Sequence, residues 1–279
     1  MKTVTSISGG MTSAYLGANY HADNLVFSLV RTTDKSCLFP DKKIRQYIAD
    51  RINSEFVGTL EDDKIIYTIL DLEQYLGKKI DIVTGITFDE TIANVGRGYL
   101  PNVMKRFCTS EMKIRPIFRW WRENFDSPVN MNIGFRATEK RRADNMVEKL
   151  NADGLSEFKD STSKHPDGRN KWETIAWRKP LFPLIEDFIY KTDVQRFWKD
   201  KPVRFAEYNN CVGCFHRSAS FLKQMSELHP NKFDWFVDAE INHKGRFKKE
   251  VSYQKIKDIN FTMTMNFESE GCNSGFCGF

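Results

Sequence analysis

Three cysteines carry the clearest chemical signal in this chain. Cys211 and Cys214 belong to a Cys-Val-Gly-Cys motif, and Cys108 lies far upstream of them. Two thiolates that are two residues apart can bind one metal centre or form a redox pair. The pattern predicts a thiolate site made by Cys108, Cys211 and Cys214, and clustered thiolates suit iron–sulfur or zinc chemistry. Three buried cysteines without a ligand are the alternative, because free cysteine is among the most buried residue types.

Two further cysteines, Cys272 and Cys277, lie near the end of the sequence. Either could carry a persulfide or supply a fourth ligand, and we take Cys277 as the candidate fourth metal ligand. They could also form a four-thiolate zinc site with Cys211 and Cys214, although the intervening segment is long for a zinc module. A tail without a role is the third interpretation. His216 could be a ligand or an acid–base group, but capping or simple hydrogen bonding is favoured.

A second signal is a glycine-rich segment between a short β-rich run and a helical pattern. Its two glycines allow a tight turn and a close approach to a ligand. The following helix N-terminus offers N–H donors and a positive dipole end, which together favour phosphate. The segment is not a Walker A loop, because no Gly-Lys-Ser/Thr follows, and an ordinary strand–helix turn is the alternative. We predict that a nucleotide phosphate is bound by Ser8, Gly9, Gly10, Met11, Thr12 and Ser13.

Basic residues follow some of the predicted strands. Arg136 comes just after a strand end, and its planar guanidinium matches a phosphate group bidentately. We therefore predict that Arg136 contacts the nucleotide, with surface ion pairing as the alternative. The second-rank candidates for phosphate contacts are Arg106, Lys113, Arg115 and Arg141.

Strand-like and helix-like segments alternate through the first half of the chain, and they must position these side chains. Apolar or β-rich runs predict strands at 3–8, 25–30, 65–70, 80–86 and 129–134. Helical patterns follow at 12–20, 44–52, 109–121 and 138–150. Strands that alternate with helices indicate right-handed βαβ units. The fold class expected is therefore α/β, with a parallel five-stranded sheet flanked by helices.

The character of the sequence changes near residue 151. We expect a nucleotide-binding α/β domain at 1–150 and a polar surface loop at 151–171. Residues 172–279 are expected to form a helical, cysteine-bearing C-terminal region packed on the first domain. Its helical patterns lie at 191–199, 218–228 and 231–240.

Composition limits the class of protein. The chain has 279 residues, of which 41% are hydrophobic and 28% charged, as is typical of a soluble globular protein. No stretch approaches the roughly 18 apolar residues of a membrane span, so no membrane association is expected. The net charge of +5 permits an anionic partner without demanding one. The first residues are too polar for a secretory leader, so we expect a cytoplasmic protein whose six cysteines act as ligands or catalytic groups.

The glycine-rich segment resembles the pyrophosphate loop (PP-loop) of the adenine nucleotide alpha-hydrolase superfamily, which reads Ser-Gly-Gly-x-Asp/Thr-Ser. Within that superfamily the chain is most similar to the phosphoadenosine phosphosulfate (PAPS) reductase family. Arg106-Phe107-Cys108-Thr109, with Lys113 and Pro116, resembles the family's Arg-x-Cys-Thr…Lys-x-x-Pro element. Gly134-Phe135-Arg136-Ala137, with Glu139, resembles its Gly-Ile-Arg-Ala-x-Glu segment. The chain departs at Met11, where many members carry lysine, so only the backbone is expected to contact phosphate there.

The resemblance implies a set of cofactors. ATP or PAPS, with Mg²⁺, would bind at residues 8–13. Similar cysteine triads occur in iron–sulfur relatives that thiolate transfer RNA or place phosphorothioates in DNA, where three thiolates hold a four-iron cluster. A 4Fe–4S cluster is therefore implied at Cys108, Cys211 and Cys214, with zinc as the alternative.

The function that the resemblance implies is that of an ATP-dependent adenylating sulfurtransferase, with Cys108, Cys211, Cys214 and Arg136 as catalytic residues. The acceptor would be a nucleobase or a nucleic-acid phosphate of tRNA or DNA, and a cysteine desulfurase is the type of sulfur donor expected. One alternative is a reductase of PAPS or adenylyl sulfate. Another is a zinc-stabilised nucleic-acid-binding protein with a vestigial nucleotide loop. A homodimer is left open.

Overall fold

The computed structural model describes residues 1–259, and its described chain divides into two compact units that are interleaved in the sequence. Unit 1 consists of Met1–Phe27, Thr68–Val83 and Arg115–Phe205. Unit 2 consists of Ser28–Tyr67, Thr84–Ile114 and the described residues from Ala206 onward. The sequence suggested consecutive segments instead. The difference arises because the chain leaves unit 1 at the ends of two strands and later returns to it.

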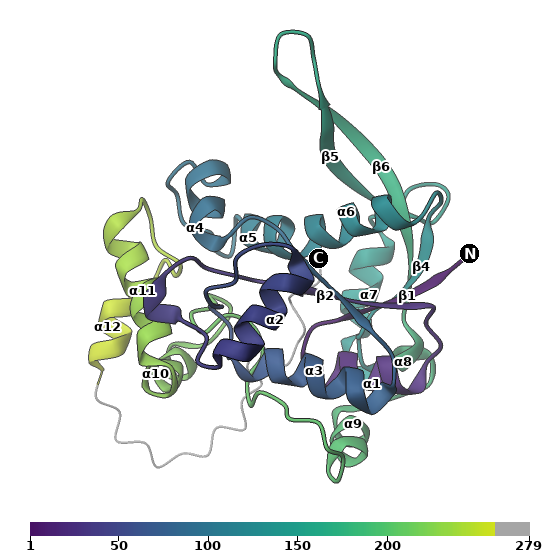
Figure 1. Cartoon of the computed structure of the whole chain (residues 1–279), viewed down its shortest axis with the longest axis horizontal. Coiled ribbons are helices and arrows are strands. Elements are labelled where there is room, and N and C mark those ends of the chain that lie inside the picture. Colours follow the sequence, from purple (N-terminus) through teal and green to yellow (C-terminus); the bar gives the residue numbers. More distant parts are fainter. Residues whose placement is uncertain (260–279) are drawn as a thin grey trace. The chain divides into compact units, whose positions relative to one another are not determined.

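Unit 1 is built around a sheet whose strand order is β3-β2-β1-β4-β6-β5 (Figure 1). The strands are β1 (Thr3–Ile7), β2 (Asn24–Leu29), β3 (Ile80–Thr84), β4 (Val129–Asn132), β5 (Ser156–Lys164) and β6 (Asn170–Leu181). Strand β1 pairs in parallel with β2 and β4, and β4 pairs in parallel with β6, whereas β5 is antiparallel to β6. The α/β class is confirmed, but the expected five-stranded parallel sheet is wrong: the described residues form a mixed sheet of six strands.

Helices flank this sheet (Figure 1). Those that lie wholly in unit 1 are α1 (Met11–Asn19), α6 (Arg115–Asn124), α7 (Lys140–Val147), α8 (Pro183–Glu186) and α9 (Lys191–Trp198), with a short 3₁₀ turn at Ala137–Glu139. Strand β2 is buried at every position after its first, as expected of a parallel strand that is covered on both faces. The short connection from β1 to α1 is the glycine-rich segment singled out above.

The predicted strand at 65–70 is wrong, because these residues belong to helix α3 (Lys64–Leu76). Their six consecutive β-branched, aromatic and aliphatic side chains imitate a buried strand. The buried side chains of Ile65, Ile69 and Leu72 instead follow the spacing of four and three residues that one face of a helix requires. A short apolar run does not by itself distinguish the two structures, so the residues after position 70 decide.

The polar surface loop predicted at 151–171 is also wrong, since most of it lies in the hairpin of β5 and β6 that extends beyond the sheet in Figure 1. The turn between the strands is closed by His165 and Arg169, whose backbone N–H and carbonyl lie 2.7 Å apart. Gly168 adopts a φ of 81°, and the Asp167 carboxylate accepts from the Arg169 N–H at 3.1 Å. The turn residues thus join two strands, and the first residues of the expected helical C-terminal region are strand β6.

A buried ion pair explains why β5 could be polar and still fold. The Asp160 side chain is 1% exposed and accepts hydrogen bonds from Arg115 and Arg119 of α6. Burial alone would raise the pKa of Asp160, but hydrogen bonding and charge from Arg119, with the charge of Arg115, hold it below its usual value. Ion pairing of Asp160 therefore stabilises β5 without the alternation of apolar and polar residues by which strands are usually recognised in a sequence.

Unit 2 is mainly helical. Its helices are α2 (Lys42–Ile52), α4 (Phe88–Glu90), α5 (Phe107–Thr109), α10 (Ala219–Leu228), α11 (Pro230–Asn242) and α12 (Tyr253–Asp258), with a 3₁₀ turn at Lys35–Cys37 and π-helical segments at Thr91–Val95 and Ser110–Ile114. The helices predicted at 44–52, 218–228 and 231–240 are confirmed. One hydrophobic core of this unit joins segments from distant parts of the sequence, including Leu60, Met112, Val212, Phe236 and Tyr253.

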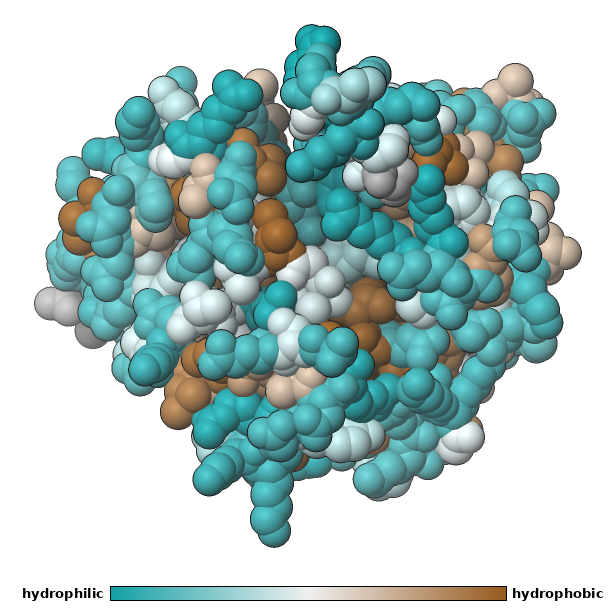
Figure 2. All heavy atoms as spheres, turned by 45° about the horizontal axis from the view of Figure 1, so that its top comes forward, coloured by the Kyte–Doolittle hydropathy of each residue, from teal (hydrophilic) through white to brown (hydrophobic). Residues whose placement is uncertain are grey.

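Among residues 1–259, none of the helices has the length and apolar character needed to span a bilayer. Figure 2 shows that hydrophilic side chains cover most of the visible face and that hydrophobic ones form small scattered groups.

Candidate functional site

Cys108, Cys211 and Cys214 line one pocket of unit 2, together with Lys113 and His216. The cavity volume is about 40 Å³, and phenylalanine rings form part of its wall. All three cysteines are partly exposed. The structure therefore brings together the three thiols that the sequence predicted to share a site.

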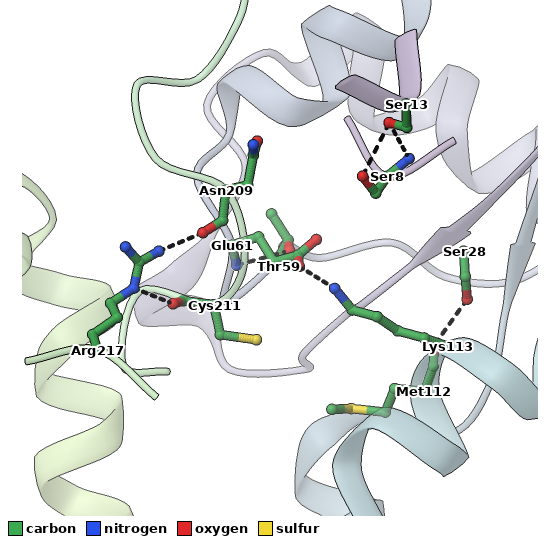
Figure 3. Close-up of polar contacts among 10 residues, drawn as sticks. All are labelled: Ser8, Ser13, Ser28, Thr59, Glu61, Met112, Lys113, Asn209, Cys211 and Arg217. Carbon is green, nitrogen blue, oxygen red and sulfur yellow. Dashed lines mark hydrogen bonds and ion pairs between the residues drawn. The ribbon is translucent and has the colours of Figure 1, made fainter. Parts of the chain in front are cut away.

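The segment that carries Cys108 is a short helical stretch anchored by its own backbone. Helix α5 contains Cys108 and runs directly into the π-helical segment Ser110–Ile114. Within that segment, the buried Met112 accepts a hydrogen bond at its carbonyl from the Ser28 hydroxyl, at 2.8 Å (Figure 3). This contact fixes the helical stretch four residues after the thiol.

The Cys211–Cys214 turn is held from several sides. The Cys214 N–H donates to the Cys211 carbonyl at 3.1 Å, and the Val212 N–H donates to the Leu60 carbonyl at 2.8 Å. The Tyr253 hydroxyl donates to the Gly213 carbonyl at 3.0 Å. A Cβ atom at position 213 would lie 2.3 Å from the Phe236 ring, so only glycine fits in this turn. The second residue between the two cysteines is thus dictated by close packing.

A buried cation adjoins this turn. Arg217 is 1% exposed, and its guanidinium donates to the main-chain carbonyls of Asn209 and Cys211, the latter at 3.4 Å. Figure 3 shows the Cys211 side chain pointing away from Arg217. The Arg217 carbonyl in turn accepts from the Lys248 ammonium at 3.0 Å. Arg217 therefore anchors the main chain at the start of the turn.

His216 lines the same pocket as the thiols. Burial, with the charges of Arg106 and Lys248, lowers its pKa from 6.5 to about 4. The imidazole is therefore neutral at physiological pH. A neutral imidazole can bind a metal ion, accept a proton or accept a hydrogen bond. Its charge state therefore fits a role as ligand or acid–base group and equally a role in simple hydrogen bonding.

A fourth described cysteine differs from these three. Cys37 is 2% exposed and belongs to the hydrophobic core of unit 2. Burial raises its pKa to about 11, so its thiol stays protonated and unreactive at neutral pH. Cys272 and Cys277, including the predicted fourth ligand, lie outside the described residues.

Two charged residues of this region escaped sequence reasoning. Glu61 is 2% exposed, and its carboxylate accepts from the Lys113 ammonium at 2.8 Å (Figure 3). Glu61 begins a run of three acidic residues that is indistinguishable in sequence from a solvated acidic turn. Arg217 carries no sequence signal either, because its partners are main-chain carbonyls.

The donor set suits an iron–sulfur cluster by its chemistry. In residues 1–259, no group of three or more His, Cys, Asp and Glu side chains is arranged around a single metal-ion position. A four-iron cluster has a different requirement, because each thiolate binds a different iron. Three thiols that line one pocket match the ligand type of such a cluster, and Lys113 of the same pocket is a cationic neighbour.

The predicted phosphate loop lies in unit 1, between β1 and α1. The Ser13 hydroxyl accepts from the Ser8 N–H at 3.0 Å and donates to the Gly10 carbonyl at 3.0 Å; Figure 3 draws the two serines. Gly9 has a φ of 75°, a left-handed conformation that favours glycine. Gly10 is the N-cap of α1 and provides no side-chain cap, so the first turn keeps backbone N–H groups for a ligand.

Arg136 follows β4, the parallel neighbour of β1, so both connections leave the same edge of the sheet. A Cβ atom at Gly134 would lie 3.7 Å from the Ser13 backbone, which places the connection after β4 against the loop. Arg136 itself is 8% exposed, and its Nε donates to the Glu139 carboxylate at 2.9 Å. This ion pair orients the guanidinium and leaves a phosphate role open.

The second-rank basic residues have separate surroundings. Lys113 pairs with Glu61, and Arg115 pairs with Asp160. Arg141 is exposed on α7. The charge of Arg106 contributes to the lowered pKa of His216. Of these four, Lys113 is the one that lines the thiol pocket.

Comparison of the sequence with protein-family models gives no match, and comparison with curated proteins gives none. The resemblance to the PAPS reductase family thus rests on the motifs quoted above and stays a prediction.

Proposed function

We propose that the protein is an ATP-dependent adenylating sulfurtransferase that acts on a nucleobase or a nucleic-acid phosphate. The observation that carries this proposal is the convergence of Cys108, Cys211 and Cys214 on one pocket. A glycine-rich strand–helix connection in unit 1 supports it, because such a connection is suited to phosphate. The thiols supply sulfur chemistry, and the loop supplies a place for the nucleotide.

The proposed reaction has two steps, adenylation of the acceptor and displacement of AMP by sulfide. An oxygen of the acceptor attacks the α-phosphorus of ATP, and the bond to pyrophosphate breaks. Sulfide then attacks the acceptor carbon or phosphorus that bears the adenylate, and AMP leaves with its oxygen. Adenylation is needed because an oxide or hydroxide is a poor leaving group, whereas AMP is a good one. No external reductant is consumed when sulfur enters as sulfide.

The residues have distinct tasks in this scheme. The loop at 8–13 would hold the polyphosphate through its backbone N–H groups other than that of Ser8, which already donates to the Ser13 hydroxyl. Mg²⁺ is expected to bind with the polyphosphate. Arg136 would stabilise negative charge as it develops on the phosphate. Cys108, Cys211 and Cys214 would hold a four-iron cluster, which when bound supplies an iron that can take up sulfide. A cysteine desulfurase is the class of partner that could deliver the sulfur. It carries sulfur as a persulfide, so with this donor a thiol reductant would supply the two electrons that release it as sulfide.

The test is a turnover assay with full-length protein purified without oxygen. Samples contain ATP, sulfide and either tRNA or DNA, and AMP formation is compared with sulfur incorporation measured by mass spectrometry of nucleosides. The proposal predicts equal amounts of AMP and incorporated sulfur, both abolished in Cys108→Ser. Sulfite release from PAPS in the presence of thioredoxin, without AMP formation from ATP, would instead identify a reductase.

A further inference from the structure

Glu61 occupies a position that links two separate cysteine-bearing segments of unit 2. Its backbone forms an antiparallel bridge with Cys211, beside the hydrogen bond between Leu60 and Val212. Its carboxylate reaches in another direction and accepts from the Lys113 ammonium at 2.8 Å. Glu61 thus contacts the Cys211 segment through its main chain and the segment after Cys108 through its side chain.

Lys113 makes this link relevant to the thiols. It lies five residues after Cys108 on the same helical stretch, and it lines the pocket that holds all three cysteines. Its side chain is 15% exposed and that of Glu61 is 3% exposed, so the ion pair is shielded from water. A shielded pair is held more firmly than a surface pair, because separating it leaves an uncompensated charge in a poorly solvated place.

The Glu61 backbone is itself fixed. The Lys232 ammonium donates to the Glu61 carbonyl at 2.7 Å and to the Asp63 carboxylate at 2.7 Å. Lys232 is 7% exposed and belongs to helix α11. The residue that links the two segments is therefore anchored to a third element of the same unit.

We propose that Glu61 is a positioning residue that fixes the segment carrying Cys108 relative to the turn carrying Cys211 and Cys214. It does so by holding the Lys113 ammonium at the wall of the thiol pocket while its own backbone pairs with Cys211. The inference concerns the arrangement of the thiols, so it does not depend on whether the protein uses ATP or transfers sulfur.

The test compares cysteine alkylation by iodoacetamide, which is neutral, and iodoacetate, which is anionic, in full-length, reduced, metal-free protein. Both reagents attack the same thiolate, so the fraction of each cysteine that is ionised cancels from the ratio of their rates. The ratio therefore reports the local electrostatic field at that cysteine. The variants are Glu61→Gln, Glu61→Asp, Lys113→Met and the double variant E61Q/K113M. Glu227→Gln is the matched control, because Glu227 is 64% exposed in its ion pair with Lys223.

Glu61→Gln releases the Lys113 ammonium, so the iodoacetate-to-iodoacetamide ratio at Cys108 and Cys211 should rise by roughly threefold or more. Lys113→Met should lower the ratio. Glu61→Asp, which keeps the carboxylate, should stay near wild type, and E227Q should change nothing. In the Lys113→Met background, Glu61→Gln should raise the ratio by clearly less than it does with Lys113 present, because the carboxylate charge is removed but no ammonium is displaced.

Backbone hydrogen exchange adds a measurement of position. Lys113→Met should speed exchange at residues 209–214, far from it in sequence, and Glu61→Gln should speed exchange at 107–114. Glu61→Gln could also change the reagent ratio only because it removes a negative charge. In that case its effect would be equal with and without Lys113, and the proposal would be overturned. Unchanged exchange at 209–214 in Lys113→Met would overturn it as well.

Discussion

The Trp198 indole N–H donates a hydrogen bond to the Met11 carbonyl oxygen at 3.0 Å, and so ties α9 to the first turn of α1. Trp198 is 4% exposed, so this contact is shielded from water. Met11 is the position at which the loop differs from the lysine found in many PP-loops that it resembles. The Trp198 hydrogen bond thus fixes the loop backbone where it enters α1.

Replacing Trp198 by phenylalanine tests this support. Trp198→Phe removes the N–H donor and should lower the free energy of unfolding by about 1 kcal/mol. Because the first turn of α1 is less firmly held, ATP affinity measured by calorimetry should fall. Trp235→Phe is the matched control, since the Trp235 indole donates to Asp89 in unit 2. Equal loss of ATP affinity in both variants would contradict a specific role for Trp198.

Arg217 should be important for stability through its contacts with main-chain carbonyls. Arg217→Met leaves the carbonyls of Asn209 and Cys211 without this donor, and a buried acceptor left in that state costs about 1–3 kcal/mol. Urea denaturation measures the change. Arg204→Met, which removes an Arg204–Asp71 ion pair whose arginine is 62% exposed, should cost less than about 1 kcal/mol. Similar losses for both arginines would argue against the importance of burial.

Gly213 should not tolerate a side chain. Gly213→Ala places a methyl group against the Phe236 ring, which is 1% exposed and packs against Phe88, Trp235 and Phe247. Overpacking of this kind should destabilise the protein by about 1–3 kcal/mol. Phe236→Leu should relieve the clash, so the double variant should be more stable than the sum of the single changes predicts. Strict additivity would show that Phe236 is not the obstacle.

His229 should make the stability of the protein fall in mild acid. Burial lowers its pKa below the usual 6.5, against the opposing charge of Asp62, whose carboxylate lies 3.6 Å away. The unfolded chain therefore binds a proton more readily than the native protein, and His229 contributes stability above about pH 6.5 that is lost as the pH falls.

The variant His229→Asn removes this titration. Denaturation curves at about pH 7.5 and pH 5.5 should show a smaller loss of stability in the variant than in the wild type, since only the wild type gains a proton on unfolding. Asp62 and Asp63 remain in both proteins and serve as an internal reference. Equal losses in the two proteins would mean that His229 does not carry the effect.

The sequence was informative where one local pattern determines the structure. The apolar run at 25–30 became the buried parallel strand β2, because a strand covered on both faces needs a nearly continuous run of apolar side chains. The β-rich run at 3–8 became the parallel strand β1. It misled at 65–70, where helical spacing appears only when Leu72 is included. The hairpin at 156–181 was missed because the Arg115–Asp160 pair joins residues far apart in sequence.

The candidate site shows the same division. Cys211 and Cys214 are recognisable from spacing alone, and their thiols share a pocket with Cys108. Glu61 and Arg217 were not recognisable, because their importance comes from burial and from partners in other segments. A short motif identifies residues that can do chemistry, whereas the residues that hold the motif in place can be identified only from the tertiary structure.

Iron and acid-labile sulfide content of full-length protein purified without oxygen tests the central claim most directly. Cys108→Ser, Cys211→Ser and Cys214→Ser are compared with Cys37→Ser, whose thiol is buried in the core. The account predicts about four iron ions and four sulfides per chain in the wild type and in Cys37→Ser, and a loss of both in the other three variants. Wild-type protein that contains zinc or no metal, or iron that persists in all three pocket variants, would contradict it.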